Sequence, residues 1–469
     1  LDSKTASLYY PNVFTIANIN MSSSAYIEES DDARRQMQSF FAMAQLGYKE
    51  SLYLDVTARN DWSSTLAFTE RKSRGFFYPS VGLSWIIPKS FSMPSLISFG
   101  KVRASWSKVG NDIPLFVSNT VGHIAAGGIP QPNDTAPFGT LKPEMSSSFE
   151  IGTEWKFFDY RMDVDLTFYK TNTKNQLFSL PSSAGAAYKY YFVNAGNIQN
   201  MGVELTFGAV PILTNQFKWN TTLNFSRNKN EVKKLHDDLA SFIQGDEGFS
   251  SSYTMRLVEG GSFGDIYGKA FERDKYGAIV YGRDGLPQEI GSGNTAKVGN
   301  CNPAFLLGWG NSFTYKDFSF YFLIDGHFGG DVLAQTQAVL DQTGVSKVSG
   351  EARTMGYVDL EGHHIYNIKG FYEQVGGRNG VTEYYMYDAT NIRLRELSLG
   401  YTLPKRLLGR KQFVKKAELS FVARNLFFIY KKAPFDPDAV LSASNSNQGI
   451  DIFGIPTTRS VGFNVKLSF

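Results

Sequence analysis

The end of the chain alternates between apolar and polar residues, and this two-residue period is the feature that most constrains the fold. From Val461 to Phe469 the odd-numbered positions are Val, Phe, Val, Leu and Phe, and the even-numbered ones are Gly, Asn, Lys and Ser. Successive side chains of a β-strand point to opposite faces, so this strand has one apolar and one polar face. The same alternation recurs over 52–59 and 162–169. Each segment has about the length of one bilayer crossing by a strand.

The composition fits a chain that crosses a membrane with strands. Aromatic residues make up 15% of the chain and charged residues 19%, and the mean hydropathy is slightly negative. A transmembrane helix needs about 18 or more apolar residues in succession, whereas the most apolar stretches, such as 80–87, are far shorter. In a membrane β-barrel, lipid-facing and lumen-facing residues alternate, so the average hydropathy stays near that of a soluble protein. We therefore predict an all-β fold, a transmembrane antiparallel β-barrel, over 1–469.

Charge, cysteine content and motifs argue against several other classes of protein. The net charge is only +3, with Lys and Arg spread evenly, which argues against a nucleic-acid partner. Cys301 is the single cysteine, which excludes an internal disulfide and a Cys-rich zinc site. The sequence has no Gly-x-Ser-x-Gly, His-Glu-x-x-His or phosphate-binding Gly-Lys-Ser/Thr motif. We predict no enzyme activity, no catalytic residue, no metal site and no cofactor.

Thirteen segments fit strands of this kind. In the eleventh, over 390–402, the apolar positions change phase between Leu394 and Leu397, which indicates a β-bulge. The predicted strands lie near 36–47, 50–60, 75–87, 98–108, 146–158, 161–172, 199–209, 216–227, 305–315, 318–327, 390–402, 416–427 and 459–469.

Short and long connections between these strands alternate. The short set is 48–49, 88–97, 159–160, 210–215, 316–317 and 403–415, and the long set is 61–74, 109–145, 173–199, 228–305, 328–391 and 428–459. Outer-membrane barrels of bacteria have short periplasmic turns and long extracellular loops. Single-chain bacterial barrels also have even strand counts, so thirteen strands ending in the periplasm predict an odd number of further strands before Leu1.

Nine short motifs follow one another from Ala58 towards the C-terminus. They are Ala58-Arg-Asn-Asp-Trp-Ser-Ser64, Phe77-Tyr-Pro-Ser-Val-Gly-Leu-Ser-Trp85, Lys101-Val-Arg-Ala-Ser-Trp-Ser-Lys-Val-Gly-Asn-Asp112, Leu141-Lys-Pro-Glu144, Ser148-Phe-Glu-Ile-Gly152, Asn194-Ala-Gly-Asn-Ile-Gln-Asn-Met-Gly-Val-Glu-Leu205, Asn391-Ile-Arg-Leu-Arg-Glu-Leu397, Ala423-Arg-Asn-Leu426 and Phe435-Asp-Pro-Asp438. Together, and in this order, they resemble the SusC/RagA-type TonB-dependent transporters of Bacteroidota. The resemblance covers nearly the whole chain.

The resemblance implies a 22-stranded barrel with an N-terminal plug, of which this chain holds the last thirteen strands. The plug, the TonB-contacting segment and the first nine strands are then expected before Leu1. The implied function is TonB-dependent active import of oligomeric nutrients, either glycan or peptide, across the outer membrane of a Gram-negative bacterium. The implied partners are the TonB complex, a SusD-like surface lipoprotein lid and outer-membrane lipids, and a dimer of the transporter–lid pair is allowed. The alternative is an importer of a siderophore, a vitamin or another metal chelate. A passive porin and an outer-membrane enzyme are further classes.

Two groups of residues are candidates for specific roles. Phe469 resembles the terminal aromatic by which outer-membrane barrels are recognised for assembly, and the alternative for it is an aromatic of the membrane interface. Aromatic loop residues can stack on a sugar ring or hold a peptide, because Tyr and Trp combine a large rigid surface with a polar group. For each of them, packing in a loop or in the interfacial belt is the alternative. These substrate-binding candidates are Trp62, Tyr188, Tyr190, Tyr191, Tyr384 and Tyr385.

Overall fold

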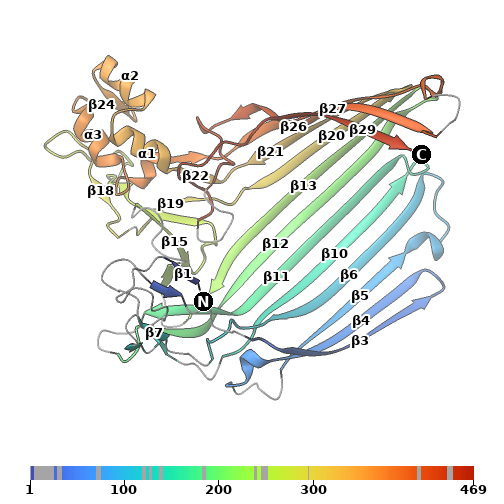
Figure 1. The fold of residues 1–469 in the computed structure, drawn as a ribbon, viewed down its shortest axis with the longest axis horizontal. Coiled ribbons are helices and arrows are strands. Elements are labelled where there is room, and N and C mark those ends of the chain that lie inside the picture. The colour runs from blue at the N-terminus through green and yellow to red at the C-terminus, as the bar shows by residue number, and fades with distance from the viewer. Residues whose placement is uncertain are drawn as a thin grey trace, which may run out of the picture.

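The fold is dominated by one curved antiparallel sheet, shown in Figure 1. A computed structural model describes residues 2–4, 26–28, 34–69, 75–118, 123–125, 129–131, 133–136, 141–181, 186–236, 240–243, 252–293, 295–408, 413–440 and 447–469. The sheet strands are β3 (Met37–Tyr48), β4 (Leu52–Ser63), β5 (Phe76–Ile86), β6 (Ile97–Asn111), β10 (Glu144–Phe157), β11 (Met162–Pro181), β12 (Tyr190–Leu213), β13 (Phe217–Lys234), β20 (Phe305–Tyr315), β21 (Phe318–Phe328), β26 (Asn391–Thr402), β27 (Lys416–Lys431) and β29 (Ser460–Ser468).

Each of these strands pairs with its neighbours in chain order, from β3 at one edge to β29 at the other. All thirteen predicted strands are therefore confirmed, and so is the fold class. The predicted bulge is also present, because β26 pairs with β27 through Leu394 and Glu396 but skips Arg395. Among the described residues, no helix is both long and apolar enough to cross a membrane.

The sheet has one apolar face. On β11 every second residue from Met162 to Phe168 is apolar, and the next residue on the same face, Lys170, is polar. Large apolar side chains of this face are exposed on several strands, Leu166 and Phe463 among them. A membrane barrel exposes such a band to lipid, and the change at Lys170 marks where β11 leaves it.

The apolar face is densely aromatic over β13, β20 and β21. Trp219 stacks on Phe313 with 5.7 Å between ring centroids. The indole N–H of Trp219 donates to Asn311 Oδ1 at 3.0 Å, and that of Trp309 donates to Thr221 Oγ1 at 3.0 Å. An N–H group that faces lipid has no water partner, so these two intramolecular bonds satisfy the polar ends of both tryptophans.

Three strands are longer than the alternation predicts. The segment 173–199, predicted as a loop, is largely strand, since β11 extends to Pro181 and β12 begins at Tyr190. The physical reason is that backbone pairing continues beyond the apolar band, where side chains such as Phe178 and Val193 pack against the loop that follows β13, so the simple alternation ends. Strand β13 likewise extends to Lys234, and Glu231 there lies between Lys229 and Lys233, at 3.0 and 2.6 Å.

The predicted long loops 228–305 and 328–391 contain folded structure. Buried side chains from both loops and from 450–452 share one core, which includes Tyr253, Phe371 and Ile450; we call these segments together the loop body. Three short helices belong to it, and they lie at the long-loop end of the sheet (Figure 1). The loop elements are β14 (Ser241–Ile243), β15 (Tyr253–Val258), β16 (Asp265–Gly268), β17 (Ala270–Phe271), β18 (Glu289–Ile290), β19 (Ala296–Asn300), β22 (Asp331–Ala334), α1 (Gln335–Gln342), α2 (Lys347–Met355), β23 (Val358–Leu360), β24 (His363–Ile365), α3 (Ile368–Val375), η4 (Thr382–Tyr385), β25 (Met386–Asp388) and β28 (Ile450–Asp451).

Smaller elements complete the described chain. They are the strands β1 (Asp2–Lys4), β2 (Tyr26–Glu28), β7 (His123–Ala125), β8 (Ile129–Gln131) and β9 (Thr135–Ala136), and the 3₁₀ helices η2 (Ser64–Leu66), η3 (Ile87–Lys89) and η5 (Lys405–Leu407).

The two faces predict opposite effects for a charge placed on β29. Phe463→Lys puts a cation into the apolar band and is expected to cost about 2–4 kcal/mol of folding free energy. Asn464→Lys puts the same cation on the polar face, where a change within about 0.5 kcal/mol is expected. Denaturant unfolding of the whole protein in lipid vesicles measures both. Equal costs for the two variants would contradict the assignment of the faces.

Candidate functional site

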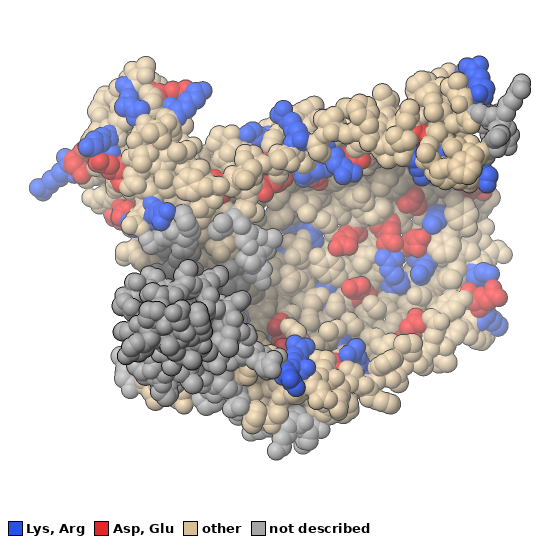
Figure 2. All heavy atoms as spheres, viewed as in Figure 1, with Lys and Arg blue, Asp and Glu red and all other residues tan. Residues whose placement is uncertain are grey.

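On the inner, hollowed face of the sheet, every second residue along a strand is mostly polar. We call such a row of residues the polar file of that strand. On β10 the residues of this file are Glu144, Ser146, Ser148, Glu150, Gly152, Glu154 and Lys156, which alternate with the apolar set. Hydrogen bonds between hydroxyl groups join this file to β11. The Oγ of Ser148 lies 2.8 Å from Oγ1 of Thr171, and the Oγ of Ser146 lies 3.2 Å from Oγ1 of Thr173. Figure 2 shows acidic and basic side chains gathered on this hollowed face. The surface suits the passage of a water-soluble molecule.

An arginine crosses one strand in the middle of this face. Arg103 on β6 pairs with Gly152 on β10, and Gly152 pairs in turn with Thr167 on β11. The guanidinium reaches over the glycine and donates to both carboxylate oxygens of Asp165, at 2.8 and 3.1 Å, and to Thr167 Oγ1 at 2.6 Å. A Cβ on Gly152 would lie 2.7 Å from Arg103 Cζ. The absent side chain is therefore what allows this fork-shaped contact.

Acidic groups outnumber basic groups in the middle of the inner face between β6 and β12. Two of the bases are paired, Arg103 with Asp165 at 2.8 Å and Lys156 with Glu154 at 3.3 Å. The excess acid gives the surface a negative potential, which attracts cationic groups. The ionisable residues are Glu150, Glu154, Asp163, Asp165 and Glu204 against Lys101, Arg103 and Lys156.

Two of the short sequence motifs meet where the β11–β12 hairpin bends. Asn194 donates through Nδ2 to the backbone oxygens of Lys142 and Asn175, at 2.8 and 2.9 Å, and accepts from the Lys142 N–H at 2.6 Å. Asn175 and Gly196 both adopt left-handed backbone conformations, with φ of 60° and 85°. Asn and Gly tolerate this region best. The motifs beginning at Leu141 and Asn194 thus fix the bend of the hairpin.

A hollow of about 400 Å³ lies beside this bend. Its polar lining includes Asp112, Lys142, Glu144 and Gln176. Aromatic side chains form part of its wall, and they come from β11 and from the loop that follows β13. These are Phe178, Phe242 and Phe263.

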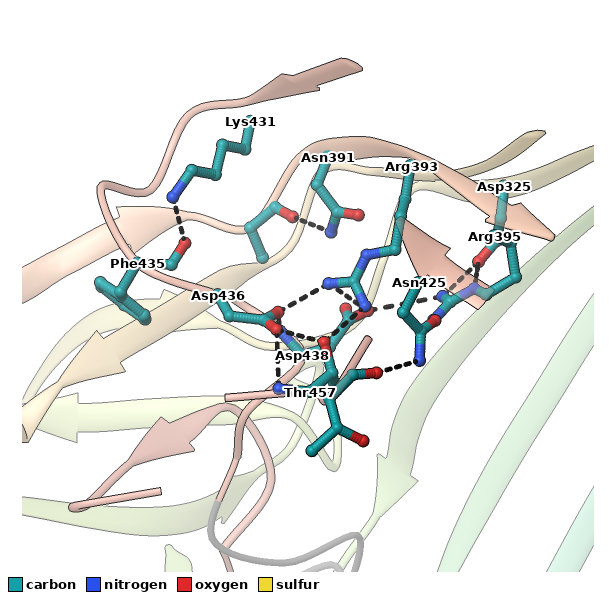
Figure 3. Close-up of polar contacts among 12 residues, drawn as sticks. Asp325, Asn391, Arg393, Arg395, Asn425, Lys431, Phe435, Asp436, Asp438 and Thr457 are labelled. Atoms are coloured by element: carbon teal, nitrogen blue, oxygen red, sulfur yellow. Dashed lines mark hydrogen bonds and ion pairs between the residues drawn. The ribbon is translucent and has the colours of Figure 1, made fainter. Parts of the chain in front are cut away.

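A buried ionic cluster joins three further motifs, as Figure 3 shows. Arg393 on β26 is 1% exposed, and its guanidinium lies 2.7 Å from Asp436 and 3.3 Å from Asp438. It also donates to Thr457 Oγ1 at 2.9 Å and lies over the ring of Phe428, 4.0 Å from the centroid. The cluster ties the last long loop to β26 and β27.

The bulged residue extends this cluster. Arg395 donates to Asp325 on β21 and, at 3.1 Å, to Asn425 on β27. Burial acts to raise the pKa of Asp436, but hydrogen bonds from Thr457 and Asp438 and the charge of Arg393 leave that pKa below its usual range. Asp436 is therefore held as a carboxylate, and its ion pair with Arg393 connects two motifs that lie far apart in the sequence.

The structure separates the predicted substrate-binding aromatics into two groups. Trp62, Tyr188, Tyr190 and Tyr191 lie at the long-loop end with 37%, 37%, 46% and 40% of their surface exposed. Tyr385 is 1% exposed in the core of the loop body, where its hydroxyl donates to Asp341 at 3.1 Å. Tyr384 packs edge-on against Phe371. Tyr385 has no surface left for a ligand, and the reason is that the long loops fold into a body with a core of its own.

Two residues lie apart from these surfaces. Phe469 ends the chain with its ring 5.1 Å from that of Phe413. Cys301 lies in the loop before β20, and its thiol contacts Gln448 Oε1 at 3.6 Å. Burial raises the pKa of Cys301 to about 11, so at neutral pH it is a thiol. Among the described residues, no cluster of three or more His, Cys, Asp or Glu is placed to bind a metal.

Comparison with known proteins decides the family. The family model described as "TonB dependent receptor-like, beta-barrel" matches residues 3–284, more than half of the chain. The chain belongs to this family of TonB-dependent receptor barrels. The receptor barrel is 26% identical to TonB-dependent receptor P3 of Formosa agariphila, with 96% of this chain and 47% of the relative covered. It is 22% identical to TonB-dependent receptor SusC of Bacteroides thetaiotaomicron, with 95% and 46% covered.

Solved structures of the RagAB peptide importer share the fold of the receptor barrel. The open-open state gives a TM-score of 0.72 at 18% identity, with 93% of this chain and 47% of that chain covered. The closed-closed state gives a TM-score of 0.71 at the same sequence identity. The receptor barrel thus spans about half the length of these relatives.

The family confirms several predictions made from the sequence. The SusC/RagA-type resemblance is confirmed, and so is the location of the receptor barrel in the outer membrane. The family consists of transport receptors rather than enzymes, as predicted. The contact of Arg103 across Gly152 was not predicted from the sequence. The signal for it was an isolated glycine within a strand, which often marks the close approach of another group.

The buried cluster makes Arg393 important for stability. Arg393→Met leaves Asp436 buried without its cation, and we expect a loss of about 3–5 kcal/mol. The double variant Arg393→Met/Asp436→Asn is expected to recover part of that loss, because it removes one of the stranded charges. Thermal unfolding of the detergent-solubilised protein measures these changes.

A matched control is Arg424→Met on β27. Arg424 is mostly exposed and pairs with Glu396 at 3.0 Å, so its loss is expected to cost less than about 1 kcal/mol. Similar destabilisation by Arg393→Met and Arg424→Met would contradict the role assigned to the buried cluster.

Proposed function

We propose that the whole protein actively imports an oligomeric nutrient, glycan or peptide, across the outer membrane with energy supplied by the TonB complex. The observation that carries the proposal is the polar, charge-lined inner face, which runs from Glu144 at the loop end to Lys156 near the short turns. A water-soluble cargo needs such a surface, and the loop body at the rim offers a place where it can be selected. Membership in the TonB-dependent receptor family supports the energy source.

The two edges of the sheet support a larger barrel. Strands β3 and β29 each pair on one side only among the described strands. An unpaired edge within lipid costs several kcal/mol for each unsatisfied backbone group. We therefore propose that strands from the rest of the protein close the barrel. A plug that carries the contact to TonB completes the transporter in this proposal.

The rim supports a partner. We propose that a SusD-like surface lipoprotein covers the long-loop end, in the way implied by the family. The exposed aromatics Trp62, Tyr188, Tyr190 and Tyr191 are our candidates for contacts with cargo, since they combine a flat apolar ring with a polar group. In this proposal Tyr384 and Tyr385 contribute by holding the loop body in shape.

Uptake by cells tests the proposed function. Cells that express the whole transporter and its lid are expected to accumulate a labelled peptide or glycan oligomer, and an uncoupler of the inner membrane should abolish accumulation because the TonB complex then has no energy supply. Accumulation that survives the uncoupler would indicate a passive pore. Accumulation of ferric siderophore or vitamin alone would favour the importer of chelates.

Assembly gives a second prediction, for Phe469. Deletion of Phe469 is expected to lower the amount of folded transporter in outer-membrane fractions severalfold, because the terminal aromatic is the proposed assembly signal. Phe413→Ala removes the ring that Phe469 contacts but leaves the terminus intact, so it should leave the yield near that of the native protein. Equal yields for the native protein and the deletion would contradict the signal.

A further inference from the structure

The hollow beside the β11–β12 bend holds hydrogen-bond acceptors that lack donors. Gln176 and Glu144 both line this hollow. The side-chain oxygen of Gln176, Oε1, is buried and has no hydrogen-bond partner among the described residues. A buried acceptor without a donor costs free energy until a donor reaches it. The hollow is therefore suited to a ligand that donates.

The charges of the hollow favour a cation. Asp112 is already engaged, because it accepts from Thr65 and from the Ile113 N–H and lies 3.4 Å from Arg35. Glu144 shares the lining with the neutral amide of Gln176, and no ion pair joins Glu144 to another described residue. Lys142 is the one basic residue among the described residues that line the hollow, and it is exposed. A donor with positive charge would satisfy Gln176 and neutralise Glu144 together.

The position of the hollow connects it to the transport surface. Glu144 is the first residue of the polar file of β10. Below it, Ser146 and Ser148 lead to Glu150 on the acidic part of the inner face. A cation bound at Glu144 therefore stands at the loop end of a negatively charged surface.

The apolar walls indicate what the cation is attached to. Phe178 and Phe242 lie with their ring centroids 4.5 Å apart, and Phe263 completes the aromatic side. Aromatic walls suit an apolar side chain next to the cation and also attract the cation itself. A peptide with an apolar first residue offers both parts, an ammonium group and an apolar side chain beside it.

We propose that this hollow binds the free amino terminus of a peptide cargo, with Glu144 and Gln176 as acceptors for the ammonium group. The proposal rests on the proposed import function and names its substrate class. The volume of about 400 Å³ accommodates a terminal residue rather than a whole oligomer. The hollow therefore selects one end of the peptide.

Binding to the purified whole transporter with its lid tests the proposal. The probes are two short peptides with an apolar first residue, identical except that one has a free and the other an acetylated amino terminus. Thermophoresis with a label at the carboxyl end gives the dissociation constants. The peptide with the free amino terminus is expected to bind at least about tenfold more tightly. Only its ammonium group can form a charge-assisted hydrogen bond, and such a bond contributes enough binding free energy for this ratio.

Two variants examine the residues. Glu144→Gln and Gln176→Leu should each remove most of the preference for the free amine and leave the acetylated peptide nearly unchanged. The matched control is Glu351→Gln on the surface of α2, where the carboxylate lies 3.5 Å from Lys347, and it should keep the full preference. Because Gln176→Leu keeps Glu144, it serves if Glu144→Gln does not fold.

Three outcomes would overturn the proposal. They are equal affinities of the two peptides for the native transporter, a preference that persists in both variants, and a preference for deacetylated over acetylated amino-sugar oligomers with none between the peptides. Failure of the import function has a different signature, namely absent uptake by cells although the purified protein still prefers the free amine.

Discussion

Backbone hydrogen bonding within lipid is the constraint on which the rest of this structure depends. Lipid offers no partners to N–H and C=O groups, so a strand in the bilayer must pair on both sides. One continuous antiparallel ladder meets this requirement for every strand between β3 and β29, which are themselves the two edges of the ladder. The ladder fixes the register of each strand, and a register fixes which side chains face lipid. The alternation along Val461–Phe469 shows in the sequence that one face of this strand meets lipid.

The same register fixes which charged side chains are neighbours on the inner face. Glycines stand where a long side chain from a neighbouring strand lies across the sheet. A Cβ on Gly152 would meet Arg103 at 2.7 Å, one on Gly202 would meet Tyr169 at 2.5 Å, and one on Gly208 would meet Asp163 at 2.3 Å. In each case the glycine leaves the polar group of its neighbour free to reach sideways. An alternating sequence thus yields polar contacts that span three strands, such as the ion pair of Arg103 with Asp165 and the hydrogen bond from Tyr169 to Asn228.

Some of this architecture could be predicted from the sequence, and the physical reasons for the limits differ. Strand positions and the bulge at Arg395 follow from a local period and from the phase change around it. The upper parts of β11 and β12 were missed because side chains such as Phe178 and Val193 pack there against the loop that follows β13, and the two-residue period of a lipid-facing strand is lost. The helices of the loop body and the burial of Tyr385 depend on contacts between distant loops, and local patterns do not record these. Arg393 and Asp436 lie 43 residues apart and meet only in the folded chain.

The family motifs serve the frame around the hollow inner face more than they serve the cargo. Asn194 ties the segment at Lys142 to the hairpin bend, and Arg393 ties the last loop to β26. Ties of this kind hold the bases of loops at fixed points on the sheet, whatever the loops themselves contain. The exposed aromatics and the walls of the hollow, such as Phe242, lie mostly in the stretches between motifs. Loops on such a frame can differ without disturbing the strand pairing that lipid demands, so the strand frame alone does not restrict the cargo.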